Sequence, residues 1–477
     1  MKSNFKKAIT GIGLNGSYQL ITIIIGIIQV PIIISVYGNE GYGFFISFTI
    51  FNLLGYFAFA DIGLPLFLQK DYFKLQNKKI GKFVVAATSL ILLISSLLLV
   101  GVLFLLKDTI FAVYENKIDT IGLTLLFFFY PLGFQNLIFD SVLRGKLDYI
   151  NSNLAQFFGE ISRFLLLIFF VITEVDLGLL ALTIPFGWVI QFFWLYYKCH
   201  NLLDYRGALR GVSYLKRNSK IIGQLYIGRV SSIVYNSSDK IIILYLGSPA
   251  LLTVYDVLSK FPLFLNKIYG LSTSTLIPLG ATLKTRSDLI IIFKRVYKLL
   301  SYSFIPIIIS LIFNFYVILN IWLKGQVIIE SWKVIVILIW AFSTVFLSFG
   351  NLLIGANLFI REITYFRISQ AFLRVFIGFI LFYLGGFNAF LMMFLVIAMF
   401  NFSFLIYFLK SFGESMLVLL DFKLIKVTFL SIMILILVHE FISFNNYLML
   451  LVSNLILLVV FLPGLLKRAK AISKIHK

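Results

Sequence analysis

The chain has 477 residues, of which 60% are apolar and only 13% are charged, about half the charged share of an ordinary soluble domain. Phe alone contributes 53 residues, and aromatic side chains make up 17% of the chain. This composition excludes a soluble globular protein, a disordered chain, a collagen and a disulfide-linked scaffold. It indicates a polytopic membrane protein with a formal net charge of +21.

Apolar runs bounded by charged or turn residues predict fourteen membrane-spanning helices, so the expected fold class is an all-α polytopic membrane protein. At about 20 residues per span, these helices leave room only for short loops and tails. The predicted spans lie at residues 9–37, 42–68, 83–106, 121–143, 152–172, 177–197, 222–246, 251–279, 298–323, 332–357, 364–384, 387–409, 424–442 and 447–466.

The basic residues predict how the spans are oriented, because Lys and Arg of short loops collect on the cytoplasmic side of a membrane. Of the 41 basic residues, 31 lie in alternate loops and at the two ends, and only Lys107, Lys117, Lys324 and Lys333 lie in the loops between them. We therefore expect a multi-pass protein with both termini in the cytoplasm. Because the positive charge is spread over short loops beside an anionic leaflet, we expect membrane lipid as a partner and no nucleic acid.

The longest predicted connection, residues 198–220, follows the sixth span, and the two parts of the chain that it separates open alike. The first part has IIISVYGNEGYGFFISF around Gly38, and the second has IIILYLGSPALLTVYDVLSKF around Gly247. Similar six-helix halves that both start in the cytoplasm are typical of transporters with parallel repeats, related by a pseudo-two-fold axis along the membrane normal. The predicted organisation is an N-terminal six-helix bundle at 1–200, a basic cytoplasmic connection at 201–221, a second six-helix bundle at 222–410, and two additional helices with a basic tail at 411–477.

Ionisable side chains inside the predicted spans are the candidates for function. They are Asp61, Asp140, Glu160, Arg163, Arg229, Asp239, Lys240, Asp256, Lys260, Lys267 and Arg374. Each costs about 2.5 to 3.5 kcal/mol at the bilayer centre on an insertion scale, so it must pair, reach the interface or face water. At about 100° per residue, the charged residues of the eighth span share one helix face, and Arg229 and Lys240 share a face of the seventh. This arrangement predicts a polar, net-positive chamber.

Six cations are predicted to bind substrate in this chamber. Arg229, Lys260 and Arg374 are the main candidates, because they lie deep in their spans and have no dedicated partner evident nearby in the sequence. The further candidates are Lys240, Lys267 and Arg163. Lys267 also lies near a helix end, where its side chain can reach the interface.

Four carboxylates are predicted to serve either ion coupling or charge pairing: Asp239, Asp256, Glu160 and Asp61. Glu160 lies three residues before Arg163, a spacing that favours a structural ion pair on one helix. Asp256 can pair with Lys260 at i,i+4, and Asp239 can neutralise Lys240 or Lys260. For Asp61, a structural role near a helix end is as good an interpretation as a functional one.

A cationic chamber favours an anionic substrate, and phosphate is the group that Arg and Lys bind well. Carrying an anion out of a negative cytoplasm is electrically downhill, so we expect an exporter. A cation-coupled multidrug exporter is an alternative, although organic cations favour an acidic chamber. A membrane glycan polymerase or ligase is another, but such an enzyme needs a sizeable outer loop, so we expect no enzyme. A single cysteine, Cys199, and three isolated histidines predict no metal or cofactor site.

Four segments carry a family resemblance. They are YGNEGYGFF at 37–45, FADIGLPLFLQK at 59–70, VLRGKLDYI at 142–150, and SSDKIIILYLGSPALLTVYDVLSKF at 237–261 followed by LIPLGATLK at 276–284. In these segments the chain resembles bacterial polysaccharide repeat-unit flippases, the Wzx-like branch of the multidrug/oligosaccharidyl-lipid/polysaccharide (MOP) exporter superfamily. The family often has Gly two residues before the Tyr of the eighth span, where this chain has Thr253.

The resemblance implies a flippase that works by alternating access in the bacterial cytoplasmic (inner) membrane. Its implied substrate is an undecaprenyl-diphosphate-linked oligosaccharide repeat unit, moved from the inner to the outer leaflet for O-antigen, and thus lipopolysaccharide, or for capsular polysaccharide. The column of Lys260 and Lys267 fits the diphosphate of such a polyprenyl-linked cargo. Candidate partners are H⁺ or Na⁺ as counter-ion and the glycan polymerase machinery.

Overall fold

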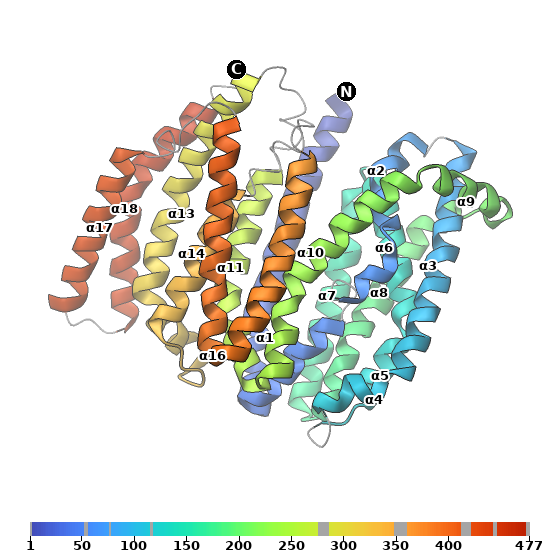
Figure 1. Ribbon diagram of the computed structural model, residues 1–477, viewed down its shortest axis with the longest axis horizontal. Helices are drawn as coiled ribbons and strands as arrows, with labels where there is room; N and C mark the ends of the chain where they lie inside the picture. The colour runs from blue at the N-terminus through green and yellow to red at the C-terminus, as the bar shows by residue number, and fades with distance from the viewer. Residues whose placement is uncertain are drawn as a thin grey trace. The chain divides into compact units, whose positions relative to one another are not determined.

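A computed structural model describes residues 2–51, 56–75, 78–114, 118–274, 286–347, 360–411, 421–441 and 446–473. Within these ranges every regular element is a helix (Figure 1). The all-α fold class is therefore confirmed. The side chain of Lys267, and residues 52–55, 275–279 and 348–357 of three predicted spans, lie outside the described parts.

Each of the fourteen predicted spans falls on a helix, or on a broken pair of helices, of the described ranges. The α-helices are α1 (Lys2–Phe48), α2 (Leu64–Leu75), α3 (Lys79–Leu105), α4 (Lys107–Phe111), α5 (Ile121–Phe128), α6 (Tyr130–Gly145), α7 (Tyr149–Ile172), α8 (Thr183–Cys199), α9 (Ala208–Arg217), α10 (Ser219–Leu246), α11 (Pro249–Ser274), α13 (Arg286–Leu323), α14 (Ser331–Leu347), α16 (Ile360–Ser411), α17 (Phe422–Phe441) and α18 (Asn446–Ser473).

Seven helical segments of the described residues are long and apolar enough to cross a membrane, or eight if α5 and α6, bent by 47° at their junction, form one span. One of the seven, Thr364–Ser411, contains two predicted spans. The protein is thus a multi-pass membrane protein. Helices α10 and α11 are not among the seven, and they are the helices whose charged residues were singled out above.

Two glycines mark the turns between consecutive predicted spans. Gly38 inside α1 has φ 69° and ψ −176°, and Gly386 inside α16 has φ 66° and ψ −158°. A left-handed φ of this kind is accessible to glycine at little cost. A Cβ at either position would meet nothing within 4 Å, so the backbone conformation rather than crowding accounts for glycine there. The predicted span boundaries at 37 and at 384 are confirmed by these breaks.

The predicted span at 42–68 is wrong as a single continuous helix. Helix α1 ends at Phe48, and two 3₁₀ turns, η1 (Thr49–Phe51) and η2 (Tyr56–Asp61), precede α2. Between η2 and α2, Ile62 has φ 54° and Gly63 has φ 73°. The Asp61 carboxylate accepts a hydrogen bond from the Gly63 amide at 2.8 Å, which fixes this turn in the way that Asx turns do. The predicted span is therefore interrupted between the end of α1 at Phe48 and the start of α2 at Leu64.

The chain divides into two compact units. Unit 1 consists of Met1–Thr253 and Arg367–Tyr383, so it holds α1 to α10, the start of α11 and part of α16. Its interior is rich in buried aromatic side chains. Among these, the Tyr114 hydroxyl donates to Ser47 at 2.7 Å, and the Tyr130 hydroxyl donates to the Phe51 carbonyl. These bonds hold the η1 turn in place.

Unit 2 consists of Val254–Phe366 and Leu384–Lys477. In its core, Tyr302 of α13 packs with Leu435 of α17 and with Leu457 and Phe461 of α18. The glycine at 464 lets α18 approach α13, since a Cβ there would lie 2.4 Å from the Tyr302 ring. The predicted bundles at 1–200 and 222–410 were divided by position along the chain and stay a prediction.

Candidate functional site

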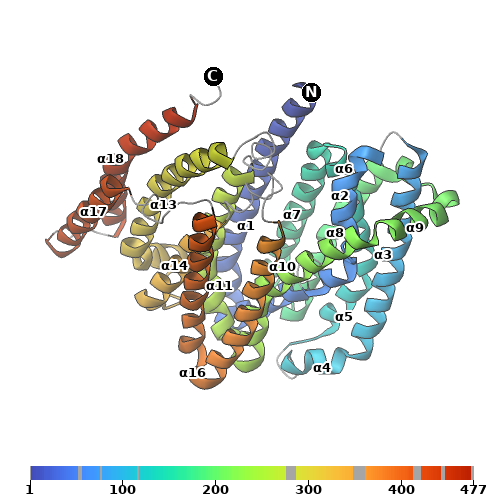
Figure 2. The ribbon, with the colours of Figure 1, turned by 45° about the horizontal axis from the view of Figure 1, so that its top comes forward.

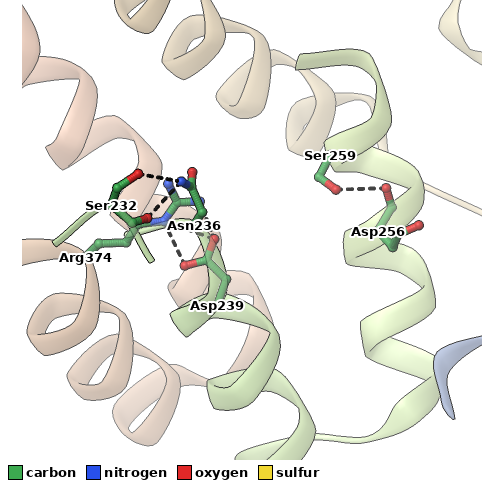
Figure 3. Close-up of polar contacts among 6 residues, drawn as sticks. All are labelled: Ser232, Asn236, Asp239, Asp256, Ser259 and Arg374. Atoms are coloured by element: carbon green, nitrogen blue, oxygen red, sulfur yellow. Dashed lines mark hydrogen bonds and ion pairs between the residues drawn. The ribbon is translucent and has the colours of Figure 1, made fainter. Parts of the chain in front are cut away.

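Two almost fully buried charges of unit 1, Arg374 of α16 and Asp239 of α10, form a bidentate ion pair (Figure 3). Arg374 Nε donates to both carboxylate oxygens, at 2.8 and 3.0 Å, and Nη2 donates to Oδ2. The two side chains are 4% and 1% exposed. The sequence shows no partner for Arg374 nearby, and the structure gives it Asp239, for which the sequence suggested Lys240 or Lys260. The two residues are 135 positions apart, so local spacing did not reveal the contact.

An aromatic ring supports the same guanidinium. The Arg374 guanidinium carbon lies 4.3 Å from the centre of the Tyr235 ring, and Tyr235 precedes Asp239 by one turn of α10. A cation over an aromatic face is stabilised further when it is desolvated. One turn of α10 thus supplies both the carboxylate and the ring that hold Arg374. Sequence reasoning missed Tyr235, for which the i,i+4 spacing to Asp239 was the available signal.

Arg229 and Asp61 form a second, looser ion pair between α10 and the η2 turn. Arg229 Nε lies 3.4 Å from Asp61 Oδ2, with side chains 24% and 1% exposed. Neither of these two atoms has a hydrogen-bond partner among the described residues. The other Asp61 oxygen accepts from the Gly63 amide. The partner of Arg229 is thus also distant in the sequence, where none is evident nearby.

Lys240 contacts a hydroxyl on the same broken segment. Its ammonium donates to Thr49 Oγ1 at 3.0 Å, and Thr49 in turn donates to the Ile46 carbonyl at 2.6 Å. Arg229 and Lys240 thus both reach the stretch between α1 and α2, as their predicted common face on one helix requires. Asp239 points instead to α16.

In unit 2, Lys260 pairs with Asp256 at 3.1 Å, four residues earlier on α11. This confirms the pairing alternative for Asp256, and it means that Lys260 has a partner after all. The Ser259 hydroxyl donates to the Asp256 carbonyl at 2.9 Å (Figure 3). The substrate-binding roles of Lys260 and Lys267 stay a prediction.

A third group of charges in unit 1 lies on α6 and α7. Arg163 and Glu160 are 3.5 Å apart, which confirms the predicted i,i+3 pair. Asp140 accepts from Arg144 Nε at 2.8 Å, from the Ser152 hydroxyl at 2.5 Å and from Gln156 at 3.2 Å. Sequence reasoning missed Ser152 and Gln156, although their i,i+4 spacing on α7 places them on one face.

Four candidate cations therefore contact a carboxylate, and Lys240 contacts a hydroxyl. The four are Arg163, Arg229, Lys260 and Arg374. A positive potential from these four does not follow, because each is neutralised locally. What the arrangement offers chemically is exchange: an incoming anion can replace the carboxylate on a guanidinium, since both are acceptors for the same planar fork. In the described residues, no group of three or more His, Cys, Asp or Glu side chains is placed to hold a metal ion.

Solved structures with the same fold are a flippase and MATE transporters. The lipid II flippase MurJ in an inward closed conformation superposes with a TM-score of 0.69 at 13% identity, over 93% of this chain and 96% of that one. An inward-facing multidrug resistance MATE family transporter of the MOP superfamily has a TM-score of 0.62 at 14% identity, over 82% and 95%. The Vibrio cholerae MATE transporter VcmN in its bent form has 0.53 at 13%, over 86% and 98%.

No protein-family model matches the sequence, and no curated protein matches it. At 13 to 14% identity the structural likeness shows the fold alone. The chain therefore has the polytopic fold that these solved transporters share.

Proposed function

We propose that this protein is a flippase for undecaprenyl-diphosphate-linked oligosaccharide repeat units, which it moves from the inner to the outer leaflet of the bacterial inner membrane. The observation that supports this most is the fold, which the chain shares over almost its whole length with a lipid II flippase. The O-antigen or capsular repeat unit as the finer substrate rests on the four segments that resemble Wzx-like flippases. Alternating access, both termini in the cytoplasm and a glycan polymerase as downstream partner belong to the same proposal.

Arg374 is the residue that we assign to the diphosphate. Two nitrogens of its guanidinium, Nε and Nη2, donate hydrogen bonds to the Asp239 carboxylate. A phosphate presents two oxygens in a comparable geometry. Exchange of carboxylate for phosphate keeps the buried guanidinium paired at every stage, which avoids the cost of an uncompensated buried charge. The released Asp239 then needs a new counter-charge, and a proton or Na⁺ supplies it. Asp239 is therefore the carboxylate that we assign to ion coupling.

A transport assay with the purified protein tests this assignment. The protein is reconstituted into vesicles, and movement of a fluorescent polyprenyl-diphosphate oligosaccharide between leaflets is measured. The Arg374→Lys variant keeps a charge for Asp239 but loses the planar fork, so we expect transport to fall roughly tenfold, about the loss of one bidentate charged contact. The protein should remain in the membrane.

The control for this assay is Glu330→Gln in the loop before α14. Glu330 is exposed and contacts Lys333 at 3.1 Å, and hydrogen bonds from Trp332 and Lys333 lower the pKa of its carboxyl. We expect this variant to transport like the unmodified protein. Normal transport by Arg374→Lys would remove Arg374 from the substrate site. Absence of transport of any diphosphate-linked glycan by the unmodified protein would refute the proposed function.

A cation-coupled multidrug exporter is the second candidate, and one observation favours it. The carboxylates on Arg229 and Arg374 neutralise these cations, which weakens the electrostatic objection to an organic cation as substrate. A strain that expresses the protein separates the two candidates: a drug exporter raises resistance to cationic dyes, whereas loss of a flippase causes lipid-linked sugar to accumulate on the inner leaflet.

A further inference from the structure

Helix α9 lies in the segment that joins α8 to α10, and it takes no part in the ion pairs described above. Two views show it beside the N-terminal end of α3, against which it packs (Figures 1 and 2). The sequence predicted a basic connection at 201–221, and the structure adds that much of it is helical. Residues 205–220 contain five basic side chains and no acidic one.

Small residues determine which side of α9 faces the protein. A Cβ on Gly207 would lie 2.2 Å from the Phe83 ring, and a Cβ on Gly211 would lie 2.2 Å from the Phe83 carbonyl oxygen. The backbone of α9 therefore lies directly on the first turns of α3. Ala208 and Leu215 are buried with it. The other side of α9 consequently faces away from the protein.

The outward side of α9 is both apolar and basic. Leu209 is 84% exposed and Val212 is 41% exposed. At about 100° per residue, these two side chains form one strip with Lys216 between them, and Arg210 and Arg217 form the adjoining strip. An apolar strip flanked by cations is typical of helices that lie in a membrane interface.

The position of α9 along α3 agrees with such an interface. Beyond its contact with α9, helix α3 exposes a series of large apolar side chains: Leu90, Leu93, Ile94, Leu97 and Leu98. Leu90 follows Phe83 by seven residues, or about 10 Å along the helix axis. Gly211 of α9 also lies against Ala87, so α9 covers the part of α3 about 5 to 10 Å before this apolar surface begins, which is where an interfacial helix lies.

We propose that α9, with Lys79 and Lys82 at the exposed start of α3, is a docking surface for anionic phospholipid head groups. The argument for an anionic lipid is charge complementarity, since the surface carries cations from two helices and residues 205–220 hold no carboxylate. Leu209 and Val212 enter the boundary of the acyl chains, and Arg210, Lys216 and Arg217 contact phosphates. A zwitterionic lipid offers no net charge to match them. This surface is independent of the proposed function.

A fluorescent probe at Leu209 tests the proposal on the full chain. Cys199, which is buried, is replaced in Cys199→Ser, and Leu209→Cys is labelled and reconstituted without any glycan cargo. Lipids with brominated acyl chains quench a probe that enters the acyl-chain boundary. We expect brominated phosphatidylglycerol to quench it roughly twofold or more better than brominated phosphatidylcholine, because each basic residue favours an anionic surface. A probe at Ser213→Cys, between the apolar and the basic strips, should be quenched less by brominated lipid than the probe at Leu209.

Reversing the charges of α9 tests whether its basic residues cause the preference for the anionic lipid. In Arg210→Glu, Lys216→Glu and Arg217→Glu combined, the preference for the anionic lipid should disappear. The matched control is Lys410→Glu, Lys423→Glu and Lys426→Glu, which makes the same change of net charge at exposed positions of α16 and α17 and should keep the preference. Equal quenching by the two lipids, or a Leu209 probe that only aqueous quenchers reach, would overturn the proposal. If Cys199→Ser fails to fold, the native chain serves as background, with the labelled unmodified protein as blank.

Discussion

Two ion pairs tie α10 to other parts of unit 1, and they are built very differently from the same residue types. Arg374 and Asp239 share three donor–acceptor contacts and an aromatic ring, with both side chains almost fully buried. Arg229 and Asp61 form a single contact, in which Arg229 Nε lies 3.4 Å from Asp61 Oδ2. Neither of these two atoms has a hydrogen-bond partner in the described residues. In the first, saturated pair, both carboxylate oxygens accept hydrogen bonds from the guanidinium. In the second, unsaturated pair, the two facing atoms form none.

The backbone explains the difference. Asp239 lies within the regular helix α10, where the backbone amides are already used by the helix, and both of its oxygens accept from Arg374. Asp61 ends a 3₁₀ turn, and one of its oxygens is used by the Gly63 amide. Gly63 itself lies against α10, since a Cβ there would be 2.9 Å from the Tyr226 amide nitrogen. The turn that brings Asp61 to α10 thus also holds one of its oxygens on the Gly63 amide.

The largest effect is expected from Arg374→Ala. This variant leaves the Asp239 carboxylate buried without its partner, and the free energy of unfolding should fall by about 3 to 5 kcal/mol. The measurement is denaturant unfolding in detergent micelles. The double variant Arg374→Met with Asp239→Leu removes both charges and should recover most of the loss. An unchanged stability of Arg374→Ala would mean that this pair is no more important than the looser one.

How much of this was accessible from the sequence depends on the range of the contact. The spans follow from apolar runs, and the pairs Glu160 with Arg163 and Asp256 with Lys260 follow from helical spacing. The partners of Arg229 and Arg374 come from distant segments that only tertiary packing brings together, so no local pattern identifies them. The broken second span left a weaker signal, the Asp-Ile-Gly sequence, which is typical of a turn.

Two of the segments that carry the family resemblance also contact each other in a way that no local sequence pattern identifies. The Gly43 region of α1 contacts the start of α11 so closely that a Cβ on Gly43 would overlap the Pro249 carbonyl. Nearby, Thr253 donates its hydroxyl to the Asn39 carbonyl at 2.5 Å. Thr253 is the residue that departs from the family pattern, and its hydroxyl has a structural use. The sequence identified both segments but not their contact.

A smaller effect is expected from Arg229→Gln. Asp61 keeps its bond from the Gly63 amide, and the lost contact lacks hydrogen-bond geometry, so the free energy of unfolding should fall by only about 1 to 2 kcal/mol. The same denaturant titration measures it beside Arg374→Ala. A loss as large as that of Arg374→Ala would erase the distinction between a saturated and an unsaturated pair.

The smallest effect is expected at the Lys240 contact, where a charge meets a hydroxyl rather than a carboxylate. Thr49→Val removes the acceptor for the Lys240 ammonium at nearly constant shape, and Lys240 keeps its further contacts. We expect a loss of about 1 kcal/mol in the free energy of unfolding. Thr49→Ser retains the hydroxyl and should lose less. Equal losses in the two variants would attribute the effect to the missing methyl group instead, and the η1 turn would then hold α10 by packing alone.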